Sequence, residues 1–464
     1  MEQQEFTQYF PQSGWVEHDA DEIWKSQCET LQTLVIRHSL SAKNVKAVGI
    51  TNQRETLVAW DKVTGQVLHR AMVWQDRRTT ERCQSLKKKG LEAGIRQKTG
   101  LLLDPYFSAT KAEWLLHHSG KVKASAKAGR LALGTIDSFL AFRLTAGKRH
   151  VTEPSNASRT LLFNLHTLDW DASLLRLFNI PRHALPEILA SDADFGTIDL
   201  PFLRGVKIHG MIGDQQAALF GNRCFGVGDI KSTYGTGCFL LKNMGAKPKL
   251  PPRGLLGTVA WSLGGKPTYA HEGSVLIGGA VVQFLRDGLG LLSKASDSEG
   301  MAESVQGNDG VYFVPAFAGL GTPYWDPNAR GLLIGLTRGT SKAHIVRAAL
   351  ESIAFQTEAV FQVFGANRRN RFRVDGGGSH NRFLMQFQSD ILGARVEVSD
   401  NPEATALGAA MLAALGAEET TMGQLKKMTF PTHAFRPMMK AKEREKLIGF
   451  WKKAVARSRG WAIA

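Results

Sequence analysis

Residues 226–245 read GVGDIKSTYGTGCFLLKNMG, a pattern that predicts a strand, a glycine turn and a returning strand. In the turn, Thr236 lies between Gly235 and Gly237. Because glycine has no Cβ, backbone N–H groups in such a turn can approach an anion closely. The stretch therefore predicts a phosphate-binding loop at the opening of the second half of the chain.

Length and composition are those of an ordinary α/β protein. The chain has 464 residues, with 43% hydrophobic and 22% charged residues, which suits about two or three domains. Strand-like apolar runs alternate with helical patterns throughout. No apolar stretch is long enough to span a bilayer, and the opening MEQQEFTQYF lacks the pattern of a signal peptide. We therefore expect a cytoplasmic chain.

The formal net charge of +16 comes from basic residues in short, scattered groups that are not interleaved with aromatics. We therefore expect no nucleic-acid partner, but a basic surface that concentrates phosphorylated ligands nearby. The cysteines are scattered without a C-x-x-C pair, which predicts reduced packing thiols rather than disulfides or a zinc site. They are Cys28, Cys83, Cys224 and Cys238.

Several secondary-structure elements can be placed from the pattern. We expect a buried strand at 45–51, a hairpin turning at Gly65, and a strand at 206–213 that runs into a helix. The boundary between the two halves is expected near 221–228. The expected helices of the second half are 344–364, 381–393, a tightly packed small-residue helix at 404–415 and a basic amphipathic helix at 440–460.

Polar motifs follow two of these strands. NQRET (52–56) places Arg54 and Glu55 at a strand end, where a donor fork and a carboxylate acceptor suit a polyol; the alternative is a surface charge pair. Asp214 lies where the 206–213 strand becomes a helix, as a general base or as a helix N-cap. Gln215 beside it could orient the same substrate.

Other motifs stay ambiguous on sequence alone. DGGGSHN (375–381) fits either close backbone approach to a ring or phosphate, or a plain strand-to-helix turn. The loop GLGTPYWDPNARG (319–331) is too apolar for disorder, which favours a functional loop. Trp74 and Tyr106 are either core aromatics or rings that stack on the carbon skeleton of a substrate.

Taken together, the motifs resemble the FGGY carbohydrate kinases, and within them the branch that phosphorylates glycerol. The resemblance runs from about Phe10 to about Leu415, and the combination of NQRET, GDQQ and YGTGCF is typical of the glycerol branch. The motifs that carry it are GITNQRET (49–56), MVWQDRRT (72–79), DPYFSATK (104–111), SNASRTLLFN (155–164), GDQQAALFG (213–221), STYGTGCF (232–239), VPAFAGLGTPYWDPNARG (314–331) and DGGGSHNRFLMQFQSDILG (375–393).

The resemblance implies an α/β protein with a duplicated actin-like ATPase (ribonuclease H-like) fold. It implies two domains, 1–222 for glycerol and 223–464 for ATP, around a shared cleft. It also implies that ATP and Mg²⁺ serve to convert glycerol to sn-glycerol 3-phosphate, with Asp214 as general base and no assigned metal ligands. Glycerol would contact Arg54, Glu55, Tyr106, Asp214 and Gln215, with Trp74 and Phe239 against its carbons, while ATP would contact Gly235, Thr236, Gly279 and Gln283, and its adenine end Gly377 and Asn381.

One departure from the family pattern concerns the first half. Nothing in the chain matches the family's opening Asp-Gln-Gly-Thr-Thr hairpin, the counterpart of residues 226–245. We therefore expect a first-half sheet with unpaired strand edges. We favour a misassigned start codon. The alternatives are a catalytically impaired remnant that binds glycerol or nucleotide, and a kinase for another polyol; the sequence leaves a homo-oligomer open.

Overall fold

The hairpin that opens the second half is present in the computed structural model, which describes residues 1–401 and 403–462. β12 (Ile230–Tyr234) and β13 (Cys238–Gly245) pair antiparallel, as predicted. β12 also pairs in parallel with β18 (Phe372–Asp375), so the turn after β12 and the loop after β18 leave the same edge of the sheet. The complete strand order of this sheet is β14 (Leu256–Leu263), β15 (Lys266–Val275), β13, β12, β18, β19 (Val396–Ser399) and β20 (Thr432–Phe435).

Three predicted helices of the second half form within two residues of their expected ends. They are α12 (Lys342–Val363), α13 (Arg382–Leu392) and α16 (Ala441–Ser458). The basic helix α16 is docked rather than free, because Trp451 is buried and stacks on Phe355 with ring centroids 5.2 Å apart. The loop at 319–331 is also docked, since Trp325 Nε1 donates a hydrogen bond to the Gly254 carbonyl at 2.7 Å.

The first half contains a five-stranded sheet around a buried tryptophan. The predicted hairpin is formed by β4 (Leu57–Asp61) and β5 (Val67–Met72), and its turn glycine, Gly65, has φ of 72°. Trp60 of β4 is fully buried against Phe139 of α6 (Ile136–Leu144). The other strands are β1 (Gln8–Tyr9), β2 (Glu17–His18) and β6 (Leu131–Thr135), in the order β1-β2-β5-β4-β6.

A separate pair of parallel strands carries two of the predicted motifs. β3 (Val48–Asn52) pairs with β11 (Ile208–Gly213), and Asn52 lies opposite Gly213. Within the described part of the chain, no strand pairs with the other edge of β3. That edge borders a cavity of about 640 Å³ between β3, α1 (Ala20–Arg37) and α14 (Ala404–Gly416). The expected open strand edge is therefore present in the first half.

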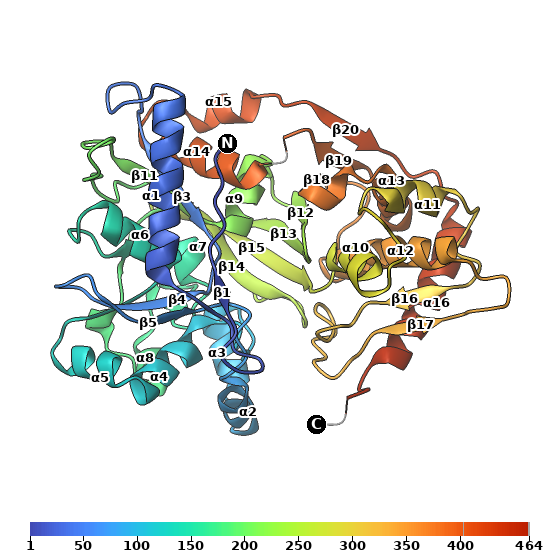
Figure 1. The fold of residues 1–464 in the computed structure, drawn as a ribbon, viewed down its shortest axis with the longest axis horizontal. Helices are drawn as coiled ribbons and strands as arrows, with labels where there is room; N and C mark the ends of the chain where they lie inside the picture. The colour runs from blue at the N-terminus through green and yellow to red at the C-terminus, as the bar shows by residue number, and fades with distance from the viewer. Residues whose placement is uncertain (402, 463–464) are drawn as a thin grey trace.

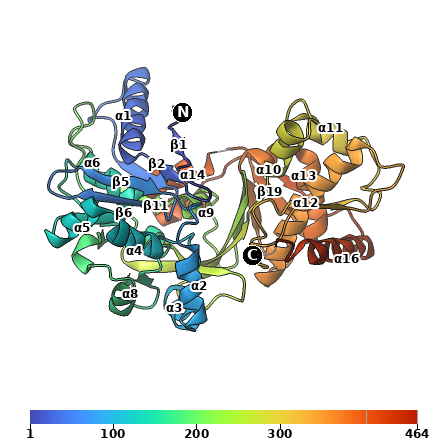
Figure 2. The same cartoon turned by 60° about the horizontal axis from the view of Figure 1, so that its bottom comes forward.

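α14 belongs to the second half of the sequence but packs on the first. It lies against β3, β11 and α9 (Asp214–Gly221), as Figures 1 and 2 show. Glycines permit this close approach, because a Cβ on Gly408 would lie 1.9 Å from the Ala217 carbonyl oxygen and one on Gly221 would lie 2.0 Å from the Ala404 carbonyl oxygen. The prediction of a tightly packed helix at 404–415 is confirmed, and this packing joins α14 of the second half to β3, β11 and α9 of the first.

All four cysteines are free in the structure, and Cys83, Cys224 and Cys238 are buried. Among residues 1–401 and 403–462, no helix has both the length and the apolar character needed to cross a membrane.

We predict that Gly408→Ala lowers the free energy of unfolding by about 1–3 kcal/mol, because the added methyl group collides with the backbone of α9. Urea denaturation measures this change. Gly300→Ala in α11 (Asp297–Glu303) is the control, because a Cβ there meets no atom within 4 Å and alanine favours a helix. Equal stability of the Gly408→Ala variant and the parent would contradict the packing account.

Candidate active site

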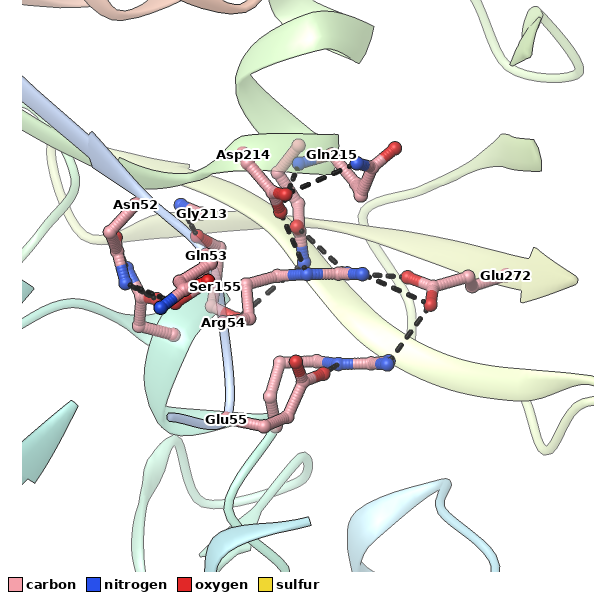
Figure 3. Close-up of polar contacts among 12 residues, drawn as sticks. Asn52, Gln53, Arg54, Glu55, Ser155, Gly213, Asp214, Gln215 and Glu272 are labelled. Carbon is pink, nitrogen blue, oxygen red and sulfur yellow. Dashed lines mark hydrogen bonds and ion pairs between the residues drawn. The ribbon is translucent and has the colours of Figure 1, made fainter. Parts of the chain in front are cut away.

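Five charged side chains alternate in sign at the ends of β3 and β11. This ion-pair network runs Glu55, Arg159, Glu272, Arg54, Asp214 (Figure 3). Arg159 Nε lies 2.6 Å from Glu55 Oε1, and Arg159 Nη2 lies 3.0 Å from Glu272 Oε1. Arg54 Nη1 lies 2.5 Å from Glu272 Oε2, and Arg54 Nε lies 3.1 Å from Asp214 Oδ1. Arg54 and Glu55 therefore belong to one network without pairing with each other.

Four members of the ion-pair network are buried, and Asp214 is the exception. The side chains of Arg54, Glu55, Arg159 and Glu272 are at most 2% exposed, whereas that of Asp214 is 32% exposed. Burial raises the pKa of Glu55. Burial opposes ionisation of Glu272 as well, but Arg159 and Arg54 outweigh it and hold the pKa of Glu272 below its usual value. The network thus ends in a single carboxylate that a ligand can reach.

Asp214 is the first residue of α9, and Gly213 occupies the N-cap position. Asp214 Oδ1 accepts the Gln215 backbone N–H at 2.7 Å, and Oδ2 accepts the Gln215 side-chain amide at 3.2 Å. The carboxylate is therefore held by Arg54 on one side and by the start of the helix on the other. The N-cap alternative for Asp214 is wrong, since the cap position belongs to Gly213.

Three aromatic residues expected around the substrate lie together. Trp74 contacts Tyr106 and Phe239 edge to face, with ring centroids 5.6 and 6.3 Å apart. All three are partly exposed. Burial raises the pKa of Tyr106, and the Glu55 carboxylate acts in the same direction, so the phenol stays protonated beside the ion-pair network. The result is an apolar wall next to a cluster of hydrogen-bonding groups.

The glycine turn at 235–237 packs against the start of α10 (Ala280–Gln283). The Gly278 and Ala280 N–H groups donate to the Thr236 carbonyl at 2.8 and 3.1 Å, and the Gly279 N–H donates to the Gly235 carbonyl at 2.8 Å. Gly235 and Thr236 are exposed, and so is Gln283 at the end of α10. The residues predicted to contact phosphates are thus brought together on an open surface.

The glycine loop after β18 lies beside that turn. A Cβ on Gly376 would lie 2.7 Å from the Tyr234 carbonyl oxygen, whereas one on Gly377 would point into open space. Asn381 caps α13, because its side-chain oxygen accepts the Leu384 N–H at 2.8 Å. Gly377 is free to face a ligand, but the Asn381 oxygen already has a structural partner.

Lys231 of β12 links the two ends of the site. Its ammonium group donates to Gln215 Oε1 at 2.5 Å and to Thr233 Oγ1 at 2.9 Å. The residue is fully buried, and burial lowers its pKa to about 8. One side chain therefore fixes both the neighbour of Asp214 and the strand that leads into the glycine turn.

Sequence reasoning assigned no role to Arg159, Glu272 or Lys231. Arg159 and Glu272 are the single Asp, Glu, Lys or Arg residues of the runs SNASRTLLFN and YAHEGSVL, and Lys231 lies two residues after Asp229 in GDIKSTYG. A charged side chain in such a run has to be paired once it is buried. This requirement is the only sign in the sequence that these three residues belong to a site. The identity of its partner depends on how distant segments meet, and no local pattern contains that information.

Family models match both halves of the chain. The model described as FGGY family of carbohydrate kinases, N-terminal domain, matches residues 1–221, and its C-terminal counterpart matches residues 230–417. The chain is 50% identical to a glycerol kinase of Halorhodospira halophila over 464 residues, covering 99% of this chain and 92% of the relative. It is 50% identical to a glycerol kinase of Trichlorobacter lovleyi over 467 residues, covering 100% and 94%.

Solved structures match over nearly the whole chain. The Plasmodium falciparum glycerol kinase with ADP superposes with a TM-score of 0.88 at 35% identity, covering 98% of this chain and 92% of that one. A ligand-bound xylulose kinase from Lactobacillus acidophilus gives a TM-score of 0.84 at 22% identity, covering 98% and 93%, which supports the fold alone. The chain therefore has the two-domain α/β fold of the actin-like ATPases, as predicted.

We predict that Glu272→Gln lowers the free energy of unfolding by about 3–5 kcal/mol, because it leaves two buried guanidinium groups facing a neutral amide. Urea denaturation at pH 7 tests this. The control is Glu351→Gln in α12, where a buried carboxylate has one arginine partner, Arg347 at 2.8 Å, and we expect a smaller loss. A loss at Glu272 no larger than that at Glu351 would contradict the role of the network.

The lowered pKa of Lys231 predicts how stability depends on pH. Between pH about 8 and about 10.5, Lys231 is neutral in the folded chain and charged in the unfolded chain. The free energy of unfolding therefore rises with pH across this interval, and this gain is lost as the pH falls back to about 8. We expect the unfolding free energy of the parent, relative to Lys231→Met, to increase from pH 8 to 10 and to be flat from pH 6 to 7. Parallel pH curves for the two proteins would refute this expectation.

Proposed function

Because the chain belongs to the FGGY family of carbohydrate kinases, we propose that it transfers the γ-phosphate of ATP to a terminal hydroxyl of glycerol, giving sn-glycerol 3-phosphate. The observation that carries the proposal is the carboxylate of Asp214, the one member of the ion-pair network that a ligand can reach, which is held by Arg54 and by Gln215, the partner of Lys231. The 50% identity to glycerol kinases over almost the whole chain supports glycerol rather than another polyol, and a kinase rather than a remnant that only binds.

Asp214 is the proposed general base. Arg54 Nε lies 3.1 Å from one carboxylate oxygen, and the Asp214 side chain is 32% exposed, so a substrate hydroxyl can reach it. A hydroxyl within hydrogen-bond reach of that carboxylate loses its proton to Asp214 as its oxygen attacks phosphorus, while the bond from phosphorus to the β,γ-bridging oxygen breaks and ADP leaves. The contact with Arg54 holds the carboxylate in place.

The proposed glycerol pocket combines polar and apolar contacts. Tyr106, Asp214 and Gln215 are partly exposed and offer both donors and acceptors to the hydroxyl groups, while Trp74 and Phe239 would lie beside the carbons. Arg54 and Glu55 are at most 2% exposed and already paired in the ion-pair network, so the contacts with glycerol predicted for them require these side chains to become accessible when the substrate binds. Such a rigid set of partners favours one orientation of a small polyol.

ATP is proposed to bind along the exposed glycine turn, with phosphates at Gly235, Thr236, Gly279 and Gln283 and the adenine end near Gly377 and Asn381. No group of three or more His, Cys, Asp or Glu side chains among the described residues could hold a metal ion. An Mg²⁺ ion carried on ATP phosphates needs only one or two protein carboxylates, so such a group is not required for it. When bound, the ion would neutralise phosphate charge.

We predict that Asp214→Asn lowers kcat for glycerol-dependent ADP release by about 10²–10⁴-fold, because the amide cannot accept the hydroxyl proton. The assay follows ADP with and without glycerol. Asp194→Asn is the control, since this exposed residue pairs with Lys207 and lies outside the site. Parent-like turnover by Asp214→Asn, or ADP release that does not depend on glycerol in the parent, would contradict the proposal.

A further inference from the structure

Glu153 is a buried carboxylate to which the proposed reaction assigns no role. It occupies the N-cap position of the short helix α7 (Pro154–Ala157) and is 0% exposed. Five uncharged donors converge on it. Oε2 accepts from Ser155 N at 2.8 Å and Ser191 Oγ at 2.7 Å, while Oε1 accepts from Asn156 N at 2.7 Å, Asn156 Nδ2 at 3.1 Å and Ser155 Oγ.

The hydrogen bonds of Glu153 connect through Asn156 to the end of β3. Asn156 and Asn52 exchange two side-chain hydrogen bonds, from Asn156 Nδ2 to Asn52 Oδ1 at 3.1 Å and from Asn52 Nδ2 to Asn156 Oδ1 at 3.0 Å. Because Glu153 accepts the other amide hydrogen of Asn156, it sets which way that amide points. Arg54 follows Asn52 by two residues.

The hydrogen bonds of Glu153 also connect through Ser155 to the end of β11. Ser155 Oγ accepts the backbone N–H of Gly213 at 2.8 Å while it donates to Glu153 (Figure 3 shows the Ser155–Gly213 contact). Asp214 is the next residue. Ser191 extends the same arrangement to β14, because its hydroxyl donates to Glu153 and accepts the Ser262 N–H at 2.9 Å.

We propose that Glu153 is a positioning residue that holds the ends of β3 and β11 together, so that Arg54 and Asp214 meet in the geometry that phosphoryl transfer requires. A carboxylate suits this position because it only accepts hydrogen bonds, whereas a glutamine amide would turn donor hydrogens toward donors. Burial raises the pKa of Glu153 to about 7, although the hydrogen bonds to its carboxylate favour the ionised form and lower the pKa. Burying the Glu153 charge lowers the stability of the fold. In return, the carboxylate orders the ends of β3 and β11.

The inference rests on the proposed function for its kinetic readout, and hydrogen–deuterium exchange tests it independently. The decisive variant is Glu153→Gln. We expect kcat to fall at least tenfold per folded molecule, KM for ATP to stay within twofold, and the Gly213 amide to exchange at least tenfold faster.

Asp137→Asn is the matched control. Asp137 is also 0% exposed and accepts from hydroxyl groups, of Thr135 and of Thr152 at 2.6 Å, but its hydrogen bonds reach neither strand end. We expect this variant to keep kcat and Gly213 exchange within twofold of the parent.

Unchanged kcat or unchanged Gly213 exchange in Glu153→Gln would overturn the inference. If that variant does not fold, Ser155→Ala, which removes the hydroxyl that joins Glu153 to the Gly213 N–H, decides by the same two readouts. If the parent shows no glycerol phosphorylation, the proposed function fails, while Gly213 exchange still decides the positioning role of Glu153.

Discussion

The structure depends on the alternation of buried charges along Glu55, Arg159, Glu272, Arg54 and Asp214. An isolated charge at any of these positions would be expensive to bury, but each inner member is flanked by opposite charges at 2.5 to 3.1 Å. The residues come from the segment after β3, from the turn after α7, from β15 and from α9, so the network forms only when the two halves of the chain meet. Its electrostatics therefore couple folding of the site to folding of the whole molecule.

Packing supplies the rigidity that this electrostatic arrangement needs. α14 crosses from the second half to the first and approaches α9 so closely that Gly408 and Gly221 leave no space for a Cβ. α14 therefore fixes the position of α9, the helix that begins with Asp214. Lys231 donates hydrogen bonds to Gln215, the residue after Asp214, and to Thr233 in the strand before the glycine turn. The open edge of β3 lies on the side of the strand that faces α1 and the cavity of about 640 Å³.

The sequence predicted those parts of the structure that local chemistry determines. The hairpin at 226–245, the turn at Gly65 and the packed helix at 404–415 follow from period, glycine placement and small-residue content, and all three are confirmed. Asp214 and Arg54 could be predicted because polar residues after a strand are brought to a common sheet edge. Arg159, Glu272 and Glu153 could not, because their importance lies in partners 38 to 218 residues away.

The most direct test of the account is a crystal structure of the chain with glycerol and a non-hydrolysable ATP analogue. The account predicts a terminal glycerol hydroxyl about 2.6–3.2 Å from the Asp214 carboxylate, the glycerol carbons against Trp74, and the last phosphate at the turn of Gly235 and Thr236. Glycerol bound away from Asp214, for example in the cavity between α1 and α14, would contradict it.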